Sequence, residues 1–530
     1  MPEHDVPVLI VGGGPVGLAA SLLLSEHGVD SLLVERNATT TDHPKAHIAN
    51  TRTMEIFRAL GVDAAVRAAA LPPRAMSHVR WVRSLAGEEL ARLDACPPAD
   101  DPSPTRTVSC AQDRVEAILL AASASRRGRL RFSTELVALE PRADGVSARL
   151  RAADGAVETL RARFAIAADG ASSGIRRQLG IGMNGLPEIA TVVGTYFHAD
   201  LSARFEARPA LLYWVMNGAA PGTFIALDGA TRWVFHVAIA EGAETPCEDD
   251  LVRTIRIAIG DPDVELDVKS IRPWRMTAQI AERYRHGPVL LAGDAAHRFP
   301  PTGGLGMNTG IQDVHNLAWK LARVLSGVSA DALLDTYEEE RRPVAQANSD
   351  FSVHNAMRGG SAVGPGARAA IAALDAGGPD VPAVLAQLRA DVEVNRAHFG
   401  APGIDLGFRY EAGALVPDGA PAPPSSAGRY LPSASPGARA PHVWLTRDGG
   451  RISSLDLFGR DFVLLVAGRP DPWRAANAHE VAPGAPFDLE PGGALLVRPD
   501  GHVAWRATTA PAEPARALAA VLRDVTRSTA

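Results

Sequence analysis

The chain has 530 residues, too many for one hydrophobic core, and its length predicts about three domains. With 46% hydrophobic and 22% charged residues, its composition is that of an ordinary globular protein. The net charge of -6 argues against nucleic acid or an anionic membrane as a main partner.

The chain begins with acidic residues, whereas a secretory signal begins with basic ones. The apolar stretch 8–24 is interrupted by glycines and a proline, which favours a turn over a membrane span. The three cysteines, Cys96, Cys110 and Cys247, have no CxxC spacing, so we expect neither a metal site nor a redox dithiol. These features predict a cytoplasmic protein in a reducing compartment.

The first elements predict a βαβ unit within a parallel sheet. Residues 6–11 form a buried strand pattern, residues 16–27 a helix that stops at Gly28, and residues 31–35 a second strand. The turn between strand and helix reads Gly12-x-Gly14-x-x-Gly17. The first glycine permits the tight turn, the second lets a pyrophosphate approach the backbone, and the third lets the helix pack closely. With Glu35 available for ribose hydroxyls, the unit predicts dinucleotide binding.

The middle of the chain predicts two further helices and then an antiparallel sheet. The helices lie at about 51–60 and 112–125, and β-rich aromatic segments follow at 191–199, 210–216, 223–227 and 232–240. Alternation along a strand sends some side chains inward to a pocket and others outward. Aromatic walls suit a flat ring substrate, although any single one of these residues is more often part of the core than a ligand contact. The candidates for substrate contact are Tyr213, Trp214, Phe224, Trp233 and His236.

A second chemical motif follows the buried strand pattern 289–292. Gly293-Asp294 ends this strand, and the glycine-rich loop 300–308 leads into a long helix that continues to about residue 325. An aspartate there can bind a ribityl hydroxyl, and the first backbone N–H groups of the helix can face the N1–C2 carbonyl edge of a flavin. Gly304-x-Gly306 does not complete a second dinucleotide fingerprint. A third motif, Asp169-Gly170, taken alone, reads as an ordinary turn after a strand.

The C-terminal third predicts helices to about residue 397, a linker rich in Pro, Gly, Ala and Ser, and a small α/β unit. Strand patterns in this last unit lie at 443–446, 462–467, 494–497 and 502–505. The unit contains no cysteine, so it cannot carry out thiol chemistry.

In this order and spacing, the three motifs resemble the class A FAD-dependent aromatic hydroxylases, the family of p-hydroxybenzoate and phenol hydroxylases. Residues 43–57 and 212–216 look like the phenol and 2,4-dichlorophenol 6-monooxygenase branch, and the C-terminal unit looks like its thioredoxin-like domain. The resemblance implies an α/β fold with a Rossmann-like FAD-binding domain of the glutathione reductase type at 1–180 and 277–397. It further implies an antiparallel β-sheet substrate domain at 181–276, a linker at 398–428 and a thioredoxin-like domain at 429–530 that is structural or part of a homodimer surface.

The resemblance also implies the residues that hold FAD. Asp294 would bind the ribityl chain, a backbone contact near Leu136 would hold the adenine, and Arg52 would face the pyrophosphate unless it is a solvated helix charge. Asp169 would be shared between FAD support and docking of NADPH or NADH, a transient co-substrate because only one nucleotide fold is present. The implied FAD contacts are Gly12, Gly14, Pro15, Val16, Glu35, Arg36, Arg52, Gln112, Leu136, Asp169, Asp294, Gly306, Met307 and Asn308.

The implied reaction is hydride transfer from NAD(P)H to FAD, followed by O2 addition to a flavin C4a-hydroperoxide that hydroxylates a small phenolic substrate. A base near the flavin would help, because a phenolate attacks faster than a phenol. His47 is the candidate, at a place where phenol hydroxylases carry an acidic residue. The alternative is a loop histidine bonded to the backbone. We interpret His297, close to Asp294, as structural.

Other flavin chemistries remain to be weighed. A halogenase usually carries a Trp-x-Trp-x-Ile-Pro element, which is missing, and a disulfide oxidoreductase needs CxxC and a second Rossmann unit. A flavin oxidase or reductase that acts on an aromatic polyketide without oxygen insertion stays open, as does FAD in a purely structural role. The sequence alone does not identify the aromatic substrate.

Overall fold

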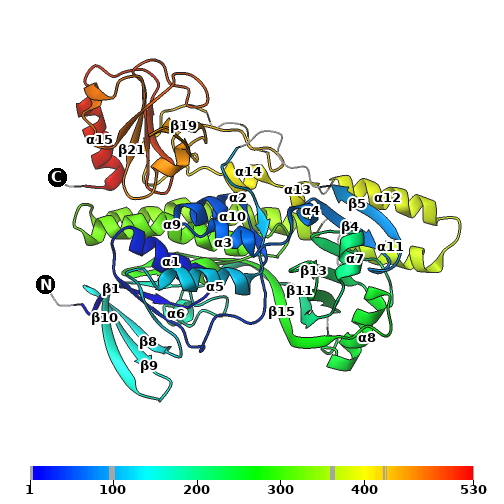
Figure 1. Ribbon diagram of the computed structural model, residues 1–530. Helices are drawn as coiled ribbons and strands as arrows, with labels where there is room; N and C mark the ends of the chain where they lie inside the picture. Colours follow the sequence, from blue (N-terminus) through cyan, green and yellow to red (C-terminus); the bar gives the residue numbers. More distant parts are fainter. Residues whose placement is uncertain are drawn as a thin grey trace.

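The computed structural model describes residues 4–94, 102–240, 242–357, 365–394, 396–421, 424 and 426–528. Cys96 and the end of the predicted C-terminal unit lie outside these residues. The chain folds into an α/β body built on two large sheets, with a smaller C-terminal domain resting on helices α2, α9 and α10 (Figure 1). No helix in these described ranges is both long and apolar enough to cross a membrane.

The first sheet confirms the predicted parallel βαβ unit. Strand β1 (Val6–Val11) pairs in parallel with β2 (Ser31–Val34) and with β10 (Val157–Ala167), and β10 pairs in parallel with β17 (Val289–Leu291). The last pairing brings residue 289 back to the first domain, as the sequence predicts. The sheet is completed by β7 (Arg129–Arg131), β8 (Glu135–Arg142), β9 (Gly145–Arg151) and β16 (Arg285–His286).

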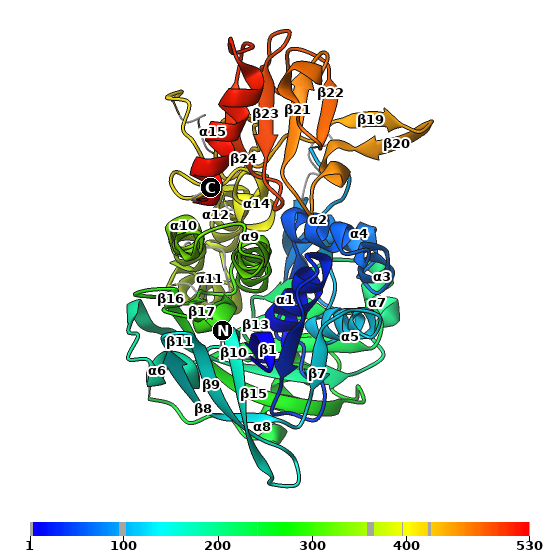
Figure 2. The ribbon, with the colours of Figure 1, turned by 90° about the vertical axis from the view of Figure 1, so that its left-hand side faces the viewer.

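Three helices cover one face of this sheet and form the largest core with it (Figure 2). Helix α1 (Pro15–Glu26) lies between α5 (Gln112–Ser123) and α9 (Gly306–Leu325). Pro15 occupies the first turn of α1, where a missing N–H costs nothing, and Gly28, with a φ of 74°, follows its end. Smaller elements nearby are β3 (Ile48–Ala49), α2 (Thr51–Ala59), α3 (Asp63–Ala68), α4 (Pro73–Met76), β6 (Val108–Ser109) and α6 (Gly174–Gln178).

The second sheet has the order β18-β15-β11-β14-β13-β12-β4-β5. Its pairings are antiparallel, as predicted, except that β12 and β4 run in parallel. Strands β4 and β5 come from residues assigned by the sequence to the first domain, so the boundary at residue 180 does not separate the two sheets. The strands are β4 (His78–Val82), β5 (Glu89–Asp94), β11 (Met183–His198), β12 (Leu212–Val215), β13 (Gly222–Ala226), β14 (Arg232–Ile239), β15 (Asp267–Ala281) and β18 (His297–Arg298).

Helices flank this sheet on both sides. Helices α7 (Ser202–Ala207) and α8 (Glu248–Ile259) lie beside one face, and α11 (Pro365–Ala376) and α12 (Val381–Val394) lie near β4 and β5 (Figure 1). Helix α10 (Asp335–Met357) runs beside α9. The predicted linker is more ordered than expected, since α13 (Arg396–Phe399) is followed by α14 (Pro402–Leu406), which packs against α2.

The C-terminal domain has a four-stranded sheet of order β22-β21-β23-β24 and one long helix, α15 (Pro514–Thr526). The predicted strands at 462–467, 494–497 and 502–505 are present, whereas the strand at residue 478 has no clear sequence pattern. The elements are β19 (Trp444–Arg447), β20 (Gly450–Ser453), β21 (Val463–Ala467), β22 (Ala478–Val481), β23 (Ala494–Val497) and β24 (Val503–Ala507).

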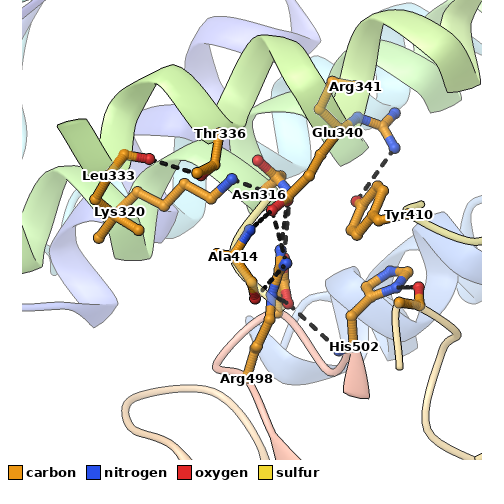
Figure 3. A network of polar contacts seen from close by, with 12 residues as sticks. Asn316, Lys320, Leu333, Thr336, Glu340, Arg341, Tyr410, Ala414, Arg498 and His502 are labelled. Carbon is orange, nitrogen blue, oxygen red and sulfur yellow. Dashed lines mark hydrogen bonds and ion pairs between the residues drawn. The ribbon is translucent and has the colours of Figure 1, made fainter. Parts of the chain in front are cut away.

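Buried charges join the C-terminal domain to α9 and α10 (Figure 3). Glu340 on α10 accepts hydrogen bonds from both terminal nitrogens of Arg498 and from Lys320 Nζ on α9. Arg498 also binds Asp500 Oδ1 and Oδ2, at 3.0 and 2.5 Å. The domain therefore contacts the body through a fully enclosed polar network next to the shared apolar cluster around Trp319.

Candidate active site

The glycine-rich turn before α1 has the geometry that a phosphate group needs. Gly12 has a φ of 113°, and an added Cβ would lie 2.2 Å from Ala168 O. A Cβ on Gly17 would lie 1.9 Å from Gly12 O, so this position must be glycine for the helix to pack on the turn. Around Gly14, by contrast, a Cβ would meet nothing within 4 Å. The N-terminus of α1 is therefore open to an anion at Gly14.

Glu35 lies directly after β2 and is held beside this turn. Its Oε2 accepts a hydrogen bond from Gly13 N at 2.7 Å, and its Oε1 accepts bonds from Asn37 N and Asn37 Nδ2. Oε1 already accepts two bonds, but Oε2 can accept a further one, so Glu35 can also bind a ribose hydroxyl. Its neighbour Arg36 is exposed.

Asp294 lies in the short turn after β17 and is free to bind a ligand. Its carboxylate has no hydrogen-bond partner among the described residues, and its side chain is exposed. Desolvation by the surrounding protein nevertheless raises its pKa, while the charges of His297 and Lys45 act in the opposite direction. Asp294 is thus accessible to a ligand, while the surrounding protein disfavours its charged form. A carboxylate at this position can accept hydrogen bonds from the hydroxyls of a ribityl chain.

A buried ion cluster holds the turn that carries Asp294. Asp313 on α9 accepts hydrogen bonds from Gly293 N at 3.2 Å and from Arg341 Nε at 2.9 Å. His297 Nε2 lies 2.7 Å from Asp313 Oδ2, and the imidazole stacks on Phe299. His297 therefore supports the turn through Asp313, which agrees with its structural interpretation.

The start of α9 presents free backbone donors. The first helical hydrogen bond runs from Thr309 N to Leu305 O, so the N–H groups of Gly306, Met307 and Asn308 have no helical acceptor. A Cβ on Gly306 would meet nothing within 4 Å, which leaves room for a flat ring beside it. The Asn308 side chain is fully occupied: it accepts from Asn50 N and donates to Ile48 O and Gly304 O. Only the backbone of Asn308 is available to a ligand.

The other residues assigned to FAD lie in different surroundings. One Asp169 oxygen accepts from Ile175 N, and the other is buried with no hydrogen-bond partner among the residues that the structure describes. Gln112 binds Ala46 N and Glu116, and so fixes the segment that precedes His47. Leu136 is half-buried on β8 against the first core.

Arg52 is directed away from these residues. Its guanidinium donates to Glu55 Oε2 at 2.9 Å and to Asp500 O at 2.5 Å, in the contact with the C-terminal domain. Helix α2 turns its side chain toward that domain, so the structure does not bring Arg52 to the glycine turn. Lys45, seven residues earlier, is exposed. Burial raises the pKa values of Asp294 and Glu116, and the positive charge of Lys45 opposes both rises. Sequence reasoning missed Lys45.

His47 lies just before β3, and both its imidazole and its backbone carbonyl are held by the residues at the end of β6. Its Nδ1 lies 3.0 Å from Ser109 Oγ, and its carbonyl accepts from Cys110 N at 2.7 Å. The second imidazole nitrogen has no partner among the described residues. Burial lowers the pKa of His47 to about 4, so the imidazole is neutral at neutral pH and can accept a hydrogen bond.

His236 lies on the sheet face that is turned toward His47. Burial lowers the pKa of His236 to about 4, and His47 and His43 would each lower it further when protonated. His236 pairs across the sheet with Gly194, which in turn pairs with Arg272, so these residues share one face. Its ring lies 5.9 Å from the indole of Trp274, edge to face. Trp274 and Arg272 are further candidates that sequence reasoning missed.

Three of the five residues expected to contact substrate lie on the opposite face. Tyr213, Phe224 and Trp233 are buried in the cluster under α7 and α8, and the Tyr213 hydroxyl donates to Arg208 O. Trp214 shares the face of His236 but packs under α11 and α12, with its Nε1 buried and unpartnered. The structure therefore places Tyr213, Phe224 and Trp233 in the core, which is the alternative that the sequence favours for any single one of them.

Comparisons with known proteins agree with this geometry. The family described as "FAD binding domain" matches residues 5–352, and the family described as "Aromatic-ring hydroxylase, C-terminal" matches residues 433–526. The chain is 38% identical over 546 residues to a putative polyketide hydroxylase of Streptomyces halstedii, covering 95% of this chain and 93% of the relative. It is 35% identical over 575 residues to a 2,4-dichlorophenol 6-monooxygenase of Cupriavidus pinatubonensis, covering 98% and 96%.

A solved structure shows the same likeness over the full length. The flavin-dependent monooxygenase PieE, in complex with FAD and substrate, matches with a TM-score of 0.89 and 36% identity, covering 99% of this chain and 100% of that one. The open glycine turn, the free Asp294 and the unpaired amides of α9 in the present chain fit an FAD that lies across the first sheet.

Proposed function

This chain belongs to the FAD-dependent aromatic-ring hydroxylases, and we propose that it inserts one oxygen atom from O2 into a polycyclic phenol at the expense of NAD(P)H. The enzyme class follows from the family. The ring system of the substrate, the use of O2 and the roles of individual residues are the proposal.

One observation carries the site assignment: residues far apart in sequence present polar groups at one edge of the first sheet, after the ends of the parallel strands β1, β2 and β17. The open turn at Gly14 would take the pyrophosphate, Glu35 the ribose and Asp294 the ribityl chain. Lys45, rather than Arg52, would neutralise the phosphates. The amides that begin α9 would face the N1–C2 carbonyl edge of the flavin, where negative charge collects on reduction. When bound, FAD supplies the redox chemistry between NAD(P)H and O2.

The protein's own contribution is to orient the phenol and keep it in reach of a proton acceptor. His47 would accept a hydrogen bond from the substrate hydroxyl through Nε2, because Ser109 holds Nδ1. His236, on the facing strand, would bind a second oxygen substituent. Both imidazoles are neutral at neutral pH, so each can accept a hydrogen bond or a proton.

The preference for a wide, flat substrate is supported by Gly194. This residue lies between His236 and Arg272 in the same row of the sheet, so no side chain rises from the central strand there. A Cβ would lie 3.1 Å from the His236 ring. The relatives include a polyketide hydroxylase, whose name agrees with a multi-ring substrate.

The purified protein, loaded with FAD, tests this proposal with a panel of one-ring and multi-ring phenols. We expect NAD(P)H oxidation and a product heavier by one oxygen atom with a multi-ring phenol. Turnover restricted to one-ring phenols would contradict the proposed substrate class.

A further inference from the structure

Asn50 lies at a junction of three parts of the chain. It precedes α2 as its N-cap, and its side-chain Oδ1 accepts a hydrogen bond from Thr53 N at 3.0 Å. Its backbone N–H donates to Asn308 Oδ1 on α9 at 2.9 Å. Its Nδ2 donates to Asp405 Oδ1 on α14 at 2.9 Å. The side-chain oxygen of buried Asn50 thus caps α2, while its backbone N–H and its Nδ2 join the start of α2 to α9 and to α14.

Asn308 carries the connection into the candidate active site. Its Nδ2 donates to Ile48 O at 2.9 Å and to Gly304 O at 2.6 Å. Ile48 is adjacent to His47, and Gly304 belongs to the loop that leads into α9. A Cβ on Gly304 would lie 3.0 Å from Ile48 Cβ, so loop and strand are in direct contact. The pair Asn50–Asn308 therefore fixes the His47 segment against the start of α9.

Asp405 forms the outer end of this series of bonds. It lies on α14, whose Gly403 N donates to Ala427 O and leaves no room for a side chain, because a Cβ would lie 1.8 Å from Ser426 O. Burial raises the pKa of the Asp405 carboxyl to about 7, Glu55 adds to the rise, and the bond from Asn50 opposes it. A carboxyl group that is enclosed at this cost requires a compensating contact, and Asn50 supplies it.

We propose that Asp405 is a positioning residue for hydroxylation: by holding the Asn50 side chain it keeps the His47 segment and the start of α9 in register. This inference rests on the proposed function, in which both of these parts contact the bound flavin and the phenol. It also assigns a role to the segment between the body and the C-terminal domain. A displacement of about 1 Å at a reacting group is enough to reduce turnover on the order of a hundred-fold.

Three variants test this role. Asp405→Ala removes the acceptor, Asp405→Asn keeps a neutral acceptor oxygen in the same place, and Arg58→Ala serves as the matched control. Arg58 lies at the other end of α2 and binds Asp456 of the C-terminal domain at 2.8 and 2.9 Å, so the control breaks a different long-range contact of α2 without touching Asn50.

The first readout is hydrogen exchange at the amides of residues 46–50 and 304–309, measured on the FAD-loaded protein and independent of turnover. We expect exchange there to rise about ten-fold or more in Asp405→Ala and to stay near the wild-type rate in Asp405→Asn and Arg58→Ala. Unchanged protection in Asp405→Ala would overturn the proposal. An equal rise in Arg58→Ala would do the same, since it would mean that any loosening of the domain contact has this effect.

The second readout is product formed per NAD(P)H consumed, with kcat and KM measured separately. We expect Asp405→Ala to lower kcat and the product yield about ten-fold with a smaller change in KM, and Asp405→Asn to restore both. If the wild type forms no hydroxylated product, the proposed function fails, while the exchange experiment still decides whether Asp405 holds the two segments. If the wild type is active and Asp405→Ala matches it, the positioning role fails alone.

Discussion

Arg498 of the C-terminal domain binds Glu340 of α10 through both terminal nitrogens, at 2.8 and 2.7 Å (Figure 3). Both side chains are fully buried, and burial, although it opposes the charge on Glu340, is outweighed by Arg498 and Lys320, so that the pKa of Glu340 falls to about 2. A domain without cysteines is thus tied to the FAD-binding body by charge pairing. The contact of this domain with the body is structural, and the domain cannot carry out thiol chemistry.

Removal of Arg498 leaves Glu340 with Lys320 alone as its cationic partner and takes away the ion pair of buried Asp500 among the described residues. We expect Arg498→Met to lower the free energy of unfolding by about 3–5 kcal/mol, because an unpaired buried carboxylate is very costly. Urea denaturation checks this. Arg131→Ala, which breaks an exposed pair with Glu158, is the control and should cost less than about 1 kcal/mol. Equal losses in both variants would contradict the structural role of the network.

The same charges predict acid sensitivity. Glu340 and Glu55 have pKa values of about 2 in the folded chain, against an ordinary value of 4.5, so their stabilisation is complete above about pH 5 and is lost as the pH falls toward 2. Burial lowers the pKa values of His502 and His315 to about 3, so below pH 6.5 the unfolded chain binds protons that the folded chain does not. Melting temperature should fall steadily from pH 6.5 downward. A plateau from pH 6.5 to 3 would contradict this.

Gly14 and Gly17 offer a matched pair in the glycine turn. Gly14→Ala has space for its methyl group in the protein, so we expect normal folding but FAD binding weakened on the order of ten-fold, because the methyl group occupies the approach of the pyrophosphate. Gly17→Ala places its Cβ against Gly12 O and should destabilise the fold itself. Flavin fluorescence titration and thermal melting separate the two effects. Unchanged FAD affinity in Gly14→Ala would place the phosphates elsewhere.

His47→Ala should lose most hydroxylation, by about a hundred-fold in kcat, while FAD still binds. Ser109→Ala, which only frees His47 Nδ1, should have a smaller effect on the same rate. Steady-state kinetics at neutral pH with product analysis measures both. Wild-type turnover in His47→Ala would show that this histidine is a loop residue held through its backbone, with no part in the reaction.

The two faces of the second sheet predict opposite effects of substitution. His236→Ala should raise KM for a multi-ring phenol about ten-fold without loss of stability, because its ring nitrogens form no hydrogen bond within the described part of the chain. Tyr213→Ala should lower stability by about 3–5 kcal/mol with KM nearly unchanged in the folded fraction, because Tyr213 is a core residue. Melting curves and kinetics on both variants check the assignment. If the two variants showed each other's expected phenotype, the face that carries Tyr213, and not the face that carries His236, would meet the substrate.

Sequence motifs located the FAD-binding elements well, because a strand, a tight turn and a helix fix the positions of Gly12, Gly14 and Glu35 within a short stretch of chain. They could not decide which face of the second sheet meets the site. Tyr213 and Trp214 are adjacent, so a shift of one residue reverses the assignment. The resemblance places Arg52 at the pyrophosphate. Its sequence does not show that the direction of α2 turns this side chain toward the C-terminal domain.

Contacts across long separations were also beyond sequence reasoning. Asn50 and Asp405 are 355 positions apart, and nothing in either local sequence indicates the other. Lys45 has an ordinary local setting, and only the return of β17 to the first sheet brings Asp294 near it. Trp274 meets His236 only because β15 carries it past that residue in the folded sheet.

The most direct measurement of the central claim uses 18O2. The FAD-loaded protein, NAD(P)H and a multi-ring phenol are mixed under labelled oxygen, and the product is analysed by mass spectrometry. An aromatic hydroxylase predicts a product that carries one 18O atom from O2. NAD(P)H oxidation that yields only peroxide with every phenol tried would contradict hydroxylation and would favour an oxidase.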